Sequence, residues 1–411
     1  MRIPPASIAF TTLLGVLVAL PSFGIDMSLP TLAEMGTAFD AAPSQVSWTT
    51  SLFMAGFAIA PLLYGPASDR FGRKPVMMFG CALFAVAGAG CAAAGSLQSL
   101  LGWRFVQGGG AGAGMTIVLA IIRDLFDGQA ARVRFSYVAI ATMVVPAIAP
   151  AAGASLLALG DWRIIPAALA SIGVVLFVVV GIGFTESARL DPMNRLAPSV
   201  VFRNYLCVLT HPVSSAYILV GAAAFGALFA YVSGSPLFLI NAAGFDPRQY
   251  GLIFAATSLA IMLGAFLNGQ FSARDVSAAS LMTVGLVLSA ASSILLLGTT
   301  LANWATFPSV MVLLLMSNFG FGLIAPNAMA GAMQPFPQTA GAASAATAFV
   351  QMATGAIVSE LVAVFYDGRS PLSTAVFMTL CSVFALSCYL LLARPAQSER
   401  RTITDIGRPE T

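Results

Sequence analysis

The sequence predicts an all-α membrane protein with twelve transmembrane helices in two six-helix pseudo-repeats. Three observations lead to this fold class: the composition, the length of the apolar segments and the distribution of positive charge. The chain has 411 residues, of which 58% are hydrophobic and only 9% are charged, whereas roughly 25% of the residues of an ordinary soluble domain are charged. Because so few charges cannot cover a water-soluble surface, the chain must expose apolar surface to lipid.

The apolar segments are long enough to cross a membrane as helices, because a spanning helix needs about 20 residues. Residues 164–184 are apolar throughout, so they lack the alternation of a barrel strand. The first run, Ile8 to Gly24, could pass for a signal peptide, but Pro21, Asp26 and Pro30 occupy the region where a small-residue cleavage site would lie. We therefore expect a retained first helix. The predicted segments are 8–28, 46–66, 75–95, 100–121, 135–159, 164–184, 212–233, 249–270, 277–298, 306–330, 340–366 and 371–393.

The positions of the basic residues predict the orientation. With the N-terminus in the cytoplasm, fifteen of the 19 Lys and Arg residues fall in cytoplasmic stretches, as the positive-inside rule requires. Arg163, Arg248 and Arg369 fall in external loops, and Arg104 lies inside a segment. We therefore expect both termini to be cytoplasmic.

The longest connection divides the segments six and six. At an offset of 206 residues, four positions recur across it: Pro30, Phe39, Asp40 and Asp69 map onto Pro236, Phe245, Asp246 and Asp275. Four matches are few for so long a chain, but they fall at equivalent places. We predict an N-terminal half (1–184), a cytoplasmic linker (185–211), a C-terminal half (212–393) and a cytoplasmic tail (394–411). Two such halves with a site near the bilayer midplane are typical of secondary transporters.

The sequence lacks the motifs of several other functional classes. The five cysteines are scattered and lack the spacing of a metal-binding or redox motif. We therefore expect them to act as small buried apolar residues, and we expect no metal or cofactor. The glycine-rich run 108–114 is flanked by apolar helix, and no G-x-x-x-x-G-K-[ST] motif occurs. We interpret the run as a site of close helix packing and expect no intrinsic ATP motor. An enzyme is not expected, because no nucleophile triad or pair of carboxylates appears in the apolar segments.

The stretch after the second segment combines glycines, an acid and three cations. It reads Gly65-Pro-Ala-Ser-Asp69-Arg70-Phe-Gly72-Arg73-Lys74 and resembles the G-x-x-x-D-R-x-G-R-[RK] signature of the major facilitator superfamily. We expect a loop in which Gly65 lets a helix approach closely, Gly72 permits a tight turn and Asp69 lies among cations. A purely topogenic basic loop would need neither the glycines nor the acid.

Two further motifs extend the resemblance over nearly the whole chain. Residues 103–108 (WRFVQG) are similar to the R-x-x-Q-G motif of the superfamily. In the fifth segment, the pattern of Pro146, Pro150 and Gly153 is similar to the G-P-x-x-G antiporter motif, with Ala149 where the family usually has glycine. Together with residues 26–30 (DMSLP), 122–126 (IRDLF) and 233–236 (SGSP), they resemble the bicyclomycin and chloramphenicol resistance group of drug and proton antiporters.

This resemblance implies a function and its partners. It implies proton-coupled efflux of small lipophilic drug-like compounds across the bacterial inner membrane by alternating access. The partners would be a small lipophilic substrate, protons and membrane lipid, with no nucleic acid, and we expect a monomer. Alternatives are the export or import of a natural metabolite or amino-acid derivative by the same fold, or an inert receptor or channel.

Asp26 and Arg104 are the candidate proton-coupling residues. An ionisable group inside a membrane segment is costly and usually functional, and an apolar setting disfavours the charged form of the Asp26 carboxyl. The alternatives are that Asp26 lies at the external headgroup boundary and that Arg104 snorkels to the interface. Glu360 is expected to be structural or interfacial, and Asn268, Asn318, Asn327, Gln334 and Gln351 to make interhelical hydrogen bonds or line a cavity.

Overall fold

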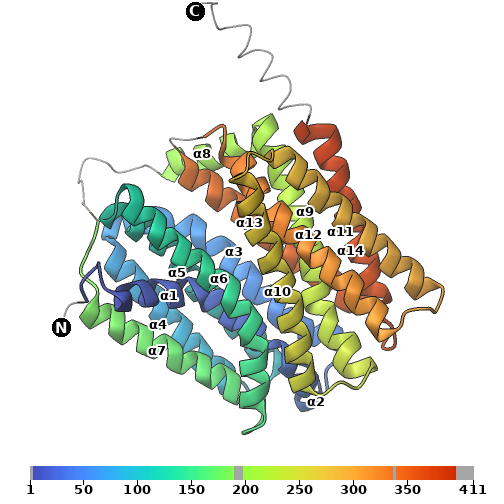
Figure 1. Ribbon diagram of the computed structural model, residues 1–411. Coiled ribbons are helices and arrows are strands. Elements are labelled where there is room, and N and C mark those ends of the chain that lie inside the picture. The colour runs from blue at the N-terminus through green and yellow to red at the C-terminus, as the bar shows by residue number, and fades with distance from the viewer. Residues whose placement is uncertain (1–2, 189–197, 337–338, 395–411) are drawn as a thin grey trace, which may run out of the picture. The chain divides into compact units, whose positions relative to one another are not determined.

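The computed structural model describes residues 3–188, 198–336 and 339–394, and Figure 1 shows these as helices joined by short connections. No strand occurs in these three ranges, so the all-α class is confirmed. Twelve helical stretches are long and apolar enough to cross a membrane, as predicted. The α-helices are α1 (Ile8–Asp26), α2 (Leu32–Phe39), α3 (Pro43–Phe71), α4 (Arg73–Ala92), α5 (Leu97–Leu125), α6 (Gly128–Leu157), α7 (Ile164–Gly183), α8 (Pro198–Thr210), α9 (Pro212–Pro236), α10 (Pro247–Ser272), α11 (Ala278–Leu301), α12 (Phe307–Met333), α13 (Ala340–Val364) and α14 (Leu372–Cys388). A 3₁₀ turn, η1 (Leu29–Thr31), and two π-helical turns, η2 (Leu237–Ala242) and η3 (Tyr389–Ala393), complete the order.

Local sequence explains where several helices begin. The side chain of Ser96 accepts a hydrogen bond from the backbone N–H of Ser99 at the start of α5, and Ser277 does the same at the start of α11. These caps satisfy N–H groups that have no partner in the first turn of a helix. Pro43 begins α3, where the missing proline N–H costs nothing.

Several predicted boundaries are wrong, because helical structure continues beyond the apolar segments. The first span runs on through η1 and α2, so it covers Ile8–Phe39 rather than ending near residue 28. α3 extends to Phe71, so most of the predicted signature loop is helix, and Gly72 alone separates α3 from α4. The predicted tail from residue 395 onward, and residues 189–197 of the predicted linker, lie outside the described residues.

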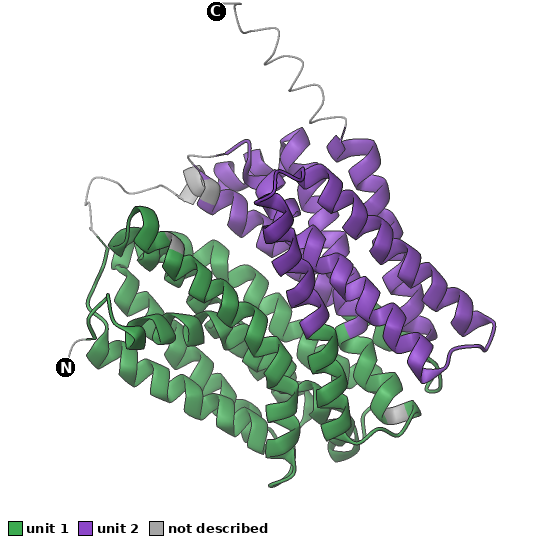
Figure 2. Cartoon of the chain, in the orientation of Figure 1, with its two compact units in different colours: residues 1–197, 232–258, 359–370 green, residues 198–231, 259–358, 371–411 purple. Residues whose placement is uncertain are grey.

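The chain packs into two compact units (Figure 2). Unit 1 contains residues 1–197, 232–258 and 359–370, and unit 2 contains residues 198–231, 259–358 and 371–411. In unit 1, α5 packs against α3 and α4, α4 packs against α7, and α1 packs against α6. In unit 2, α11 packs against α12 and α14. The predicted division of the sequence into halves, linker and tail concerns internal repeats and stays a prediction.

The glycine-rich run lies in α5 and faces three neighbouring helices of unit 1. A Cβ atom at Gly108 would meet the Phe53 carbonyl of α3, and one at Gly114 would meet the Leu17 carbonyl of α1. A Cβ atom at Gly110 would meet the backbone of α4 at Phe84. The interpretation of this run as a helix-packing surface is therefore confirmed.

The cysteine prediction holds for three of the five residues. Cys81, Cys91 and Cys388 are buried, and Cys381 is partly buried. Cys207 is exposed on α8, so the prediction is wrong at that position. The reason is that α8 is a short helix outside the twelve spans, where an apolar sequence neighbourhood does not imply burial.

Candidate functional site

Asp26 is the last residue of α1, and its side chain is only 6% exposed. It lies thirteen residues before the end of the helical stretch Ile8–Phe39, and its placement relative to the external headgroup boundary stays a prediction. Among the described residues, none donates a hydrogen bond to its carboxyl or forms an ion pair with it. Asp26 is therefore a buried acidic group of a candidate membrane span without a partner among the described residues, and burial of a lone carboxylate is costly.

Arg104 points into unit 1 and is 2% exposed, which excludes the snorkelling alternative. Its guanidinium donates to the Gly24 carbonyl of α1 at 2.9 Å, to the Thr49 carbonyl of α3 at 3.2 Å and to the Gln107 side chain at 2.9 Å. The guanidinium carbon also lies 4.6 Å from the centre of the Phe53 ring. One buried cation thus joins α1, α3 and α5.

The Arg104 guanidinium binds the last turn of α1 rather than the Asp26 carboxylate. Gly24, whose carbonyl it binds, lies two residues before Asp26, and the same carbonyl accepts the Ser28 hydroxyl at 3.0 Å. Carbonyls at the C-terminal end of a helix carry partial negative charge, which a cation stabilises. The structure therefore brings Arg104 and Asp26 to the same end of α1, and the salt bridges of the described residues do not include this pair.

Residues 104–108 show why the R-x-x-Q-G pattern has its spacing. Arg104 and Gln107 are three residues apart on α5, so their side chains meet on one helix face. Gly108 lies against the Phe53 carbonyl and leaves no room for a Cβ atom. The arginine, the amide that holds it and the close approach to α3 form one packed unit.

The α6 motif contacts the same end of α1. Pro146 and Pro150 lie inside the continuous helix α6, where each leaves the carbonyl four residues earlier without its helical donor. A Cβ atom at Gly153 would meet the Met27 carbonyl, so α6 packs closely beside Asp26. The residue that follows Asp26 therefore contacts the proline-containing helix α6.

The signature residues form a hydrogen-bonded cluster at the junction of α3 and α4. Arg73 binds Asp69 at 2.5 Å and Asp124 of α5 at 2.9 Å, and it donates to the Ser68 hydroxyl at 2.7 Å. Arg70 is exposed and lies over the Phe71 ring. This arrangement agrees with the expected placement of Asp69 among cations.

The two signature glycines behave differently. Gly72 has a φ angle of +99°, which only glycine adopts readily, so the expected tight turn is present. No atom lies within 4 Å of a Cβ built at Gly65, so the expected close helix approach there is wrong for the described residues. Gly65 lies in the middle of a helical turn of α3 where the surroundings are open.

Glu186 belongs to this cluster and was missed by sequence analysis. Its two carboxylate oxygens accept the backbone N–H groups of Arg73 and Lys74 at 2.8 and 3.0 Å, which caps the N-terminus of α4. A Cβ atom at Gly72 would also lie 2.5 Å from this carboxylate. No local sequence signal marks Glu186, because its partners lie 113 and 112 residues earlier.

Three of the remaining polar candidates make hydrogen bonds between helices. Asn327 of α12 donates to Asn268 of α10 at 2.6 Å, so this pair makes the expected interhelical hydrogen bond within unit 2. Glu360 of α13 accepts the Ser47 hydroxyl of α3 at 3.1 Å within unit 1. In the described ranges, no group of three or more His, Cys, Asp or Glu side chains is placed to hold a metal ion.

Comparison with known proteins identifies the family. A model of the Major Facilitator Superfamily matches residues 14–359. A bicyclomycin resistance protein homolog of Haemophilus influenzae is 29% identical over 387 residues, which cover 93% of this chain and 96% of that protein. The multidrug resistance protein MdtL of Shewanella oneidensis is 28% identical over 399 residues, covering 94% and 95%.

Solved structures support the fold. The xylose transporter XylE of E. coli superposes with a TM-score of 0.69 at 16% identity, covering 93% of this chain and 98% of that chain. A peptide transporter, POT, superposes with a TM-score of 0.74 at 14% identity, covering 97% of each chain. Because the family model matches most of a chain with twelve candidate spans, this multi-pass inner-membrane protein belongs to the major facilitator superfamily of transporters.

Proposed function

We propose that the protein exports small lipophilic drug-like compounds across the bacterial inner membrane in exchange for protons. The observation that carries this proposal is the Asp26 carboxyl, which is buried in a candidate span and has no partner among the described residues. The relatives named for bicyclomycin and multidrug resistance support the substrate class. In the proposed orientation both termini are cytoplasmic, and the protein works as a monomer.

In the proposed cycle, Asp26 takes up and releases the coupling proton. The unprotonated carboxylate is costly in this apolar place, so binding of a proton removes the cost, and the protein can exchange the proton for the substrate in alternating access. Arg104 is a positioning residue, because it holds the last turn of α1 that carries Asp26. Asp69, Arg70, Gly72, Arg73 and Lys74 would control switching at the α3–α4 junction, and Pro146, Pro150 and Gly153 would let α6 move against α1.

The test is transport by purified protein in liposomes with an imposed pH difference. Asp26→Asn keeps the size and hydrogen bonding of the side chain but fixes it neutral, so we expect substrate binding without drug-driven proton release. Substrate affinity should depend on pH in the natural protein and lose that dependence in Asp26→Asn, because proton and ligand must influence each other reciprocally. Asp26→Glu, the conservative control, should keep part of the activity.

Drug transport against its gradient by Asp26→Asn would remove Asp26 from the proposed mechanism. A resistance panel in a host without its own efflux pumps identifies the substrate. If no drug gives resistance and a metabolite or amino-acid derivative is transported instead, the alternative function with the same fold is correct.

A further inference from the structure

The short helix α8 presents an exposed apolar face outside the twelve candidate spans (Figure 1). It covers Pro198–Thr210 and ends one residue before the next span helix, α9. On α8, Phe202 is 68% exposed, Leu206 is 51% exposed and Leu209 is 37% exposed. These positions are four and three residues apart, so the three side chains lie on one face of the helix. Clustered exposed apolar side chains of this kind mark an interaction surface.

The other faces of α8 are accounted for by protein and by water. Val208 is 1% exposed and belongs to a buried core cluster with residues of α9 and η3, and Tyr205 packs against the same cluster. Arg203 and Cys207 are exposed and lie four residues apart, so they form a polar face. α8 is therefore held on unit 2 by one face, is polar on a second face and exposes apolar side chains on a third.

The neighbouring span places α8 at the membrane surface. The span Pro212–Ile240 has 29 residues, which at 1.5 Å per residue extend about 43 Å. This length already matches a bilayer with its headgroups, about 40–45 Å. The chain bends at His211, and Pro212 has no N–H with which to continue the helical hydrogen bonds. α8 is therefore not an extension of the span, and it lies where lipid headgroups meet water.

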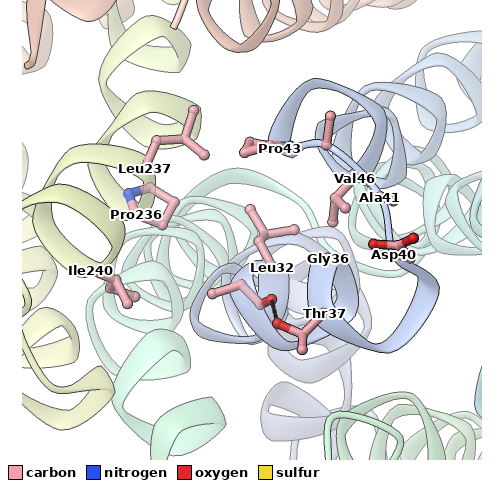
Figure 3. Close-up of a pocket in the computed structure, with 12 residues that line it drawn as sticks. Leu32, Gly36, Thr37, Asp40, Ala41, Pro43, Val46, Pro236, Leu237 and Ile240 are labelled. Atoms are coloured by element: carbon pink, nitrogen blue, oxygen red, sulfur yellow. Dashed lines mark hydrogen bonds between the residues drawn. The ribbon is translucent and has the colours of Figure 1, made fainter. Parts of the chain in front are cut away.

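The exposed face of α8 suits a bilayer surface rather than a small molecule. Small ligands bind in concave sites that bury most of their surface. A pocket of about 550 Å³ lies in unit 1 (Figure 3), and its lining residues come from within residues 32–46 and 236–240, not from α8. The three apolar side chains of α8 instead stand on the convex surface of one helix. A membrane covers such a face without a groove, because its apolar interior is continuous.

The charges beside this face are complementary to an anionic lipid surface. Arg203 is exposed on α8, and Arg394, the residue after η3, is also exposed. α8 and η3 contribute to the same core cluster, so the two arginines belong to elements that pack together. Neither α8 nor η3 contains an acidic residue. Anionic headgroups attract basic side chains at the membrane surface.

We propose that α8 lies in the membrane–water interface, with Phe202, Leu206 and Leu209 inserted into lipid and Arg203 bound to the phosphate of an anionic phospholipid. The long arginine side chain reaches the headgroups while the apolar face is in the acyl boundary. Because Val208 fixes α8 to unit 2, this contact anchors the adjoining end of α9 to the lipid surface. In the proposed orientation this is the cytoplasmic surface. The inference goes beyond the transport reaction and is independent of the substrate.

The first test measures which phase covers the apolar face, by fluorescence quenching in liposomes of phosphatidylcholine and phosphatidylglycerol. Leu206→Cys, in full-length protein that also carries Cys207→Ser, receives a bimane label on the apolar face. The matched control is the same label at the native Cys207 on the polar face, since Cys81, Cys91 and Cys388 are buried. A nitroxide near the top of the lipid acyl chain should quench the label at position 206 at least about threefold more strongly than the label at Cys207. Aqueous iodide should show the opposite order.

Two results would overturn the proposal. Strong iodide quenching at position 206, with nitroxide quenching no greater than at Cys207, would place the face in water. Weak quenching by both agents would show that protein covers the face, either another segment of this chain or a second copy. Leu209→Cys, on the same face, is the second labelled variant, and the same results are expected from it if Leu206→Cys fails to fold.

The second test concerns the charge and compares the nitroxide on phosphatidylglycerol with the nitroxide on phosphatidylcholine, at equal amounts. At position 206, the anionic lipid should quench about twofold to fivefold more strongly, because Arg203 enriches it locally. Arg203→Gln should abolish this preference. Arg248→Gln, the same change at an exposed arginine of α10, is the control and should keep it. Equal quenching by the two lipids with Arg203 present, or an unchanged preference in Arg203→Gln, overturns the assignment of Arg203 to a lipid phosphate.

Discussion

Arg104 connects three helices through the hydrogen bonds of one side chain. Its guanidinium is buried and bonded to carbonyls of α1 and α3 and to an amide of its own helix. A planar fork with five donors can meet acceptors in several directions, whereas the compact ammonium of lysine cannot reach them all. The side chain therefore has a structural task in addition to the role in proton coupling proposed above.

This geometry predicts the effect of Arg104→Lys. At least one of the Gly24 and Thr49 carbonyls should lose its partner, so we expect a loss of roughly 2–3 kcal/mol in the free energy of unfolding. Thermal melting in detergent measures it, with transport measured in parallel. Arg248→Lys, at an exposed arginine of α10, is the control and should melt like the natural protein. Equal melting of both variants would contradict the structural role of Arg104.

At the scale of elements, the α3–α4 junction depends on one glycine. Gly72 supplies a backbone conformation that other residues avoid, and it makes room for the Glu186 carboxylate that caps α4. The Asp69–Arg73–Asp124 cluster holds the same junction from the other side. The junction therefore joins α3, α4, α5 and the segment after α7.

The two signature glycines provide a matched pair of variants. Gly72→Ala should cost about 1–3 kcal/mol of backbone strain and displace Glu186, so we expect transport to fall strongly while the protein still inserts in the membrane. Gly65→Ala adds the same methyl group in open space and should transport normally. Asp69→Asn should also impair transport, because it weakens the bond to Arg73. Normal transport rates in Gly72→Ala and Asp69→Asn would return this region to a purely topogenic role.

The short helix α8 offers a native reporter of sidedness. Cys207 is exposed there, whereas Cys81, Cys91 and Cys388 are buried. A membrane-impermeant maleimide should therefore label the protein in inverted vesicles and not in intact cells. Cys207→Ser, the control, should abolish most of the labelling. Labelling of Cys207 in intact cells would place α8 outside the cytoplasm.

At the scale of the whole molecule, the charge distribution predicts the topology. Reporter fusions at Gln397 and within residues 189–203 should report the cytoplasm, and fusions near Asp161 and Gly368 should report the outside. The physical reason is that loops rich in Lys and Arg resist translocation across the membrane. A single reversed reporter would break the proposed arrangement of twelve spans.

The sequence by itself determined the fold class, the number of spans and the family resemblance. Hydropathy and charge act over about 20 neighbouring residues, so they can be read from a linear chain. The helical continuation through Phe39 and Phe71 escaped this approach, because polar and turn-forming residues remain helical when packing supports them. Only the tertiary structure decided that Arg104 holds the Gly24 carbonyl, that Glu186 caps α4 and that Ser47 holds Glu360. These contacts join residues 80, 113 and 313 positions apart, and such pairing arises from the packing of helices, which no local pattern encodes.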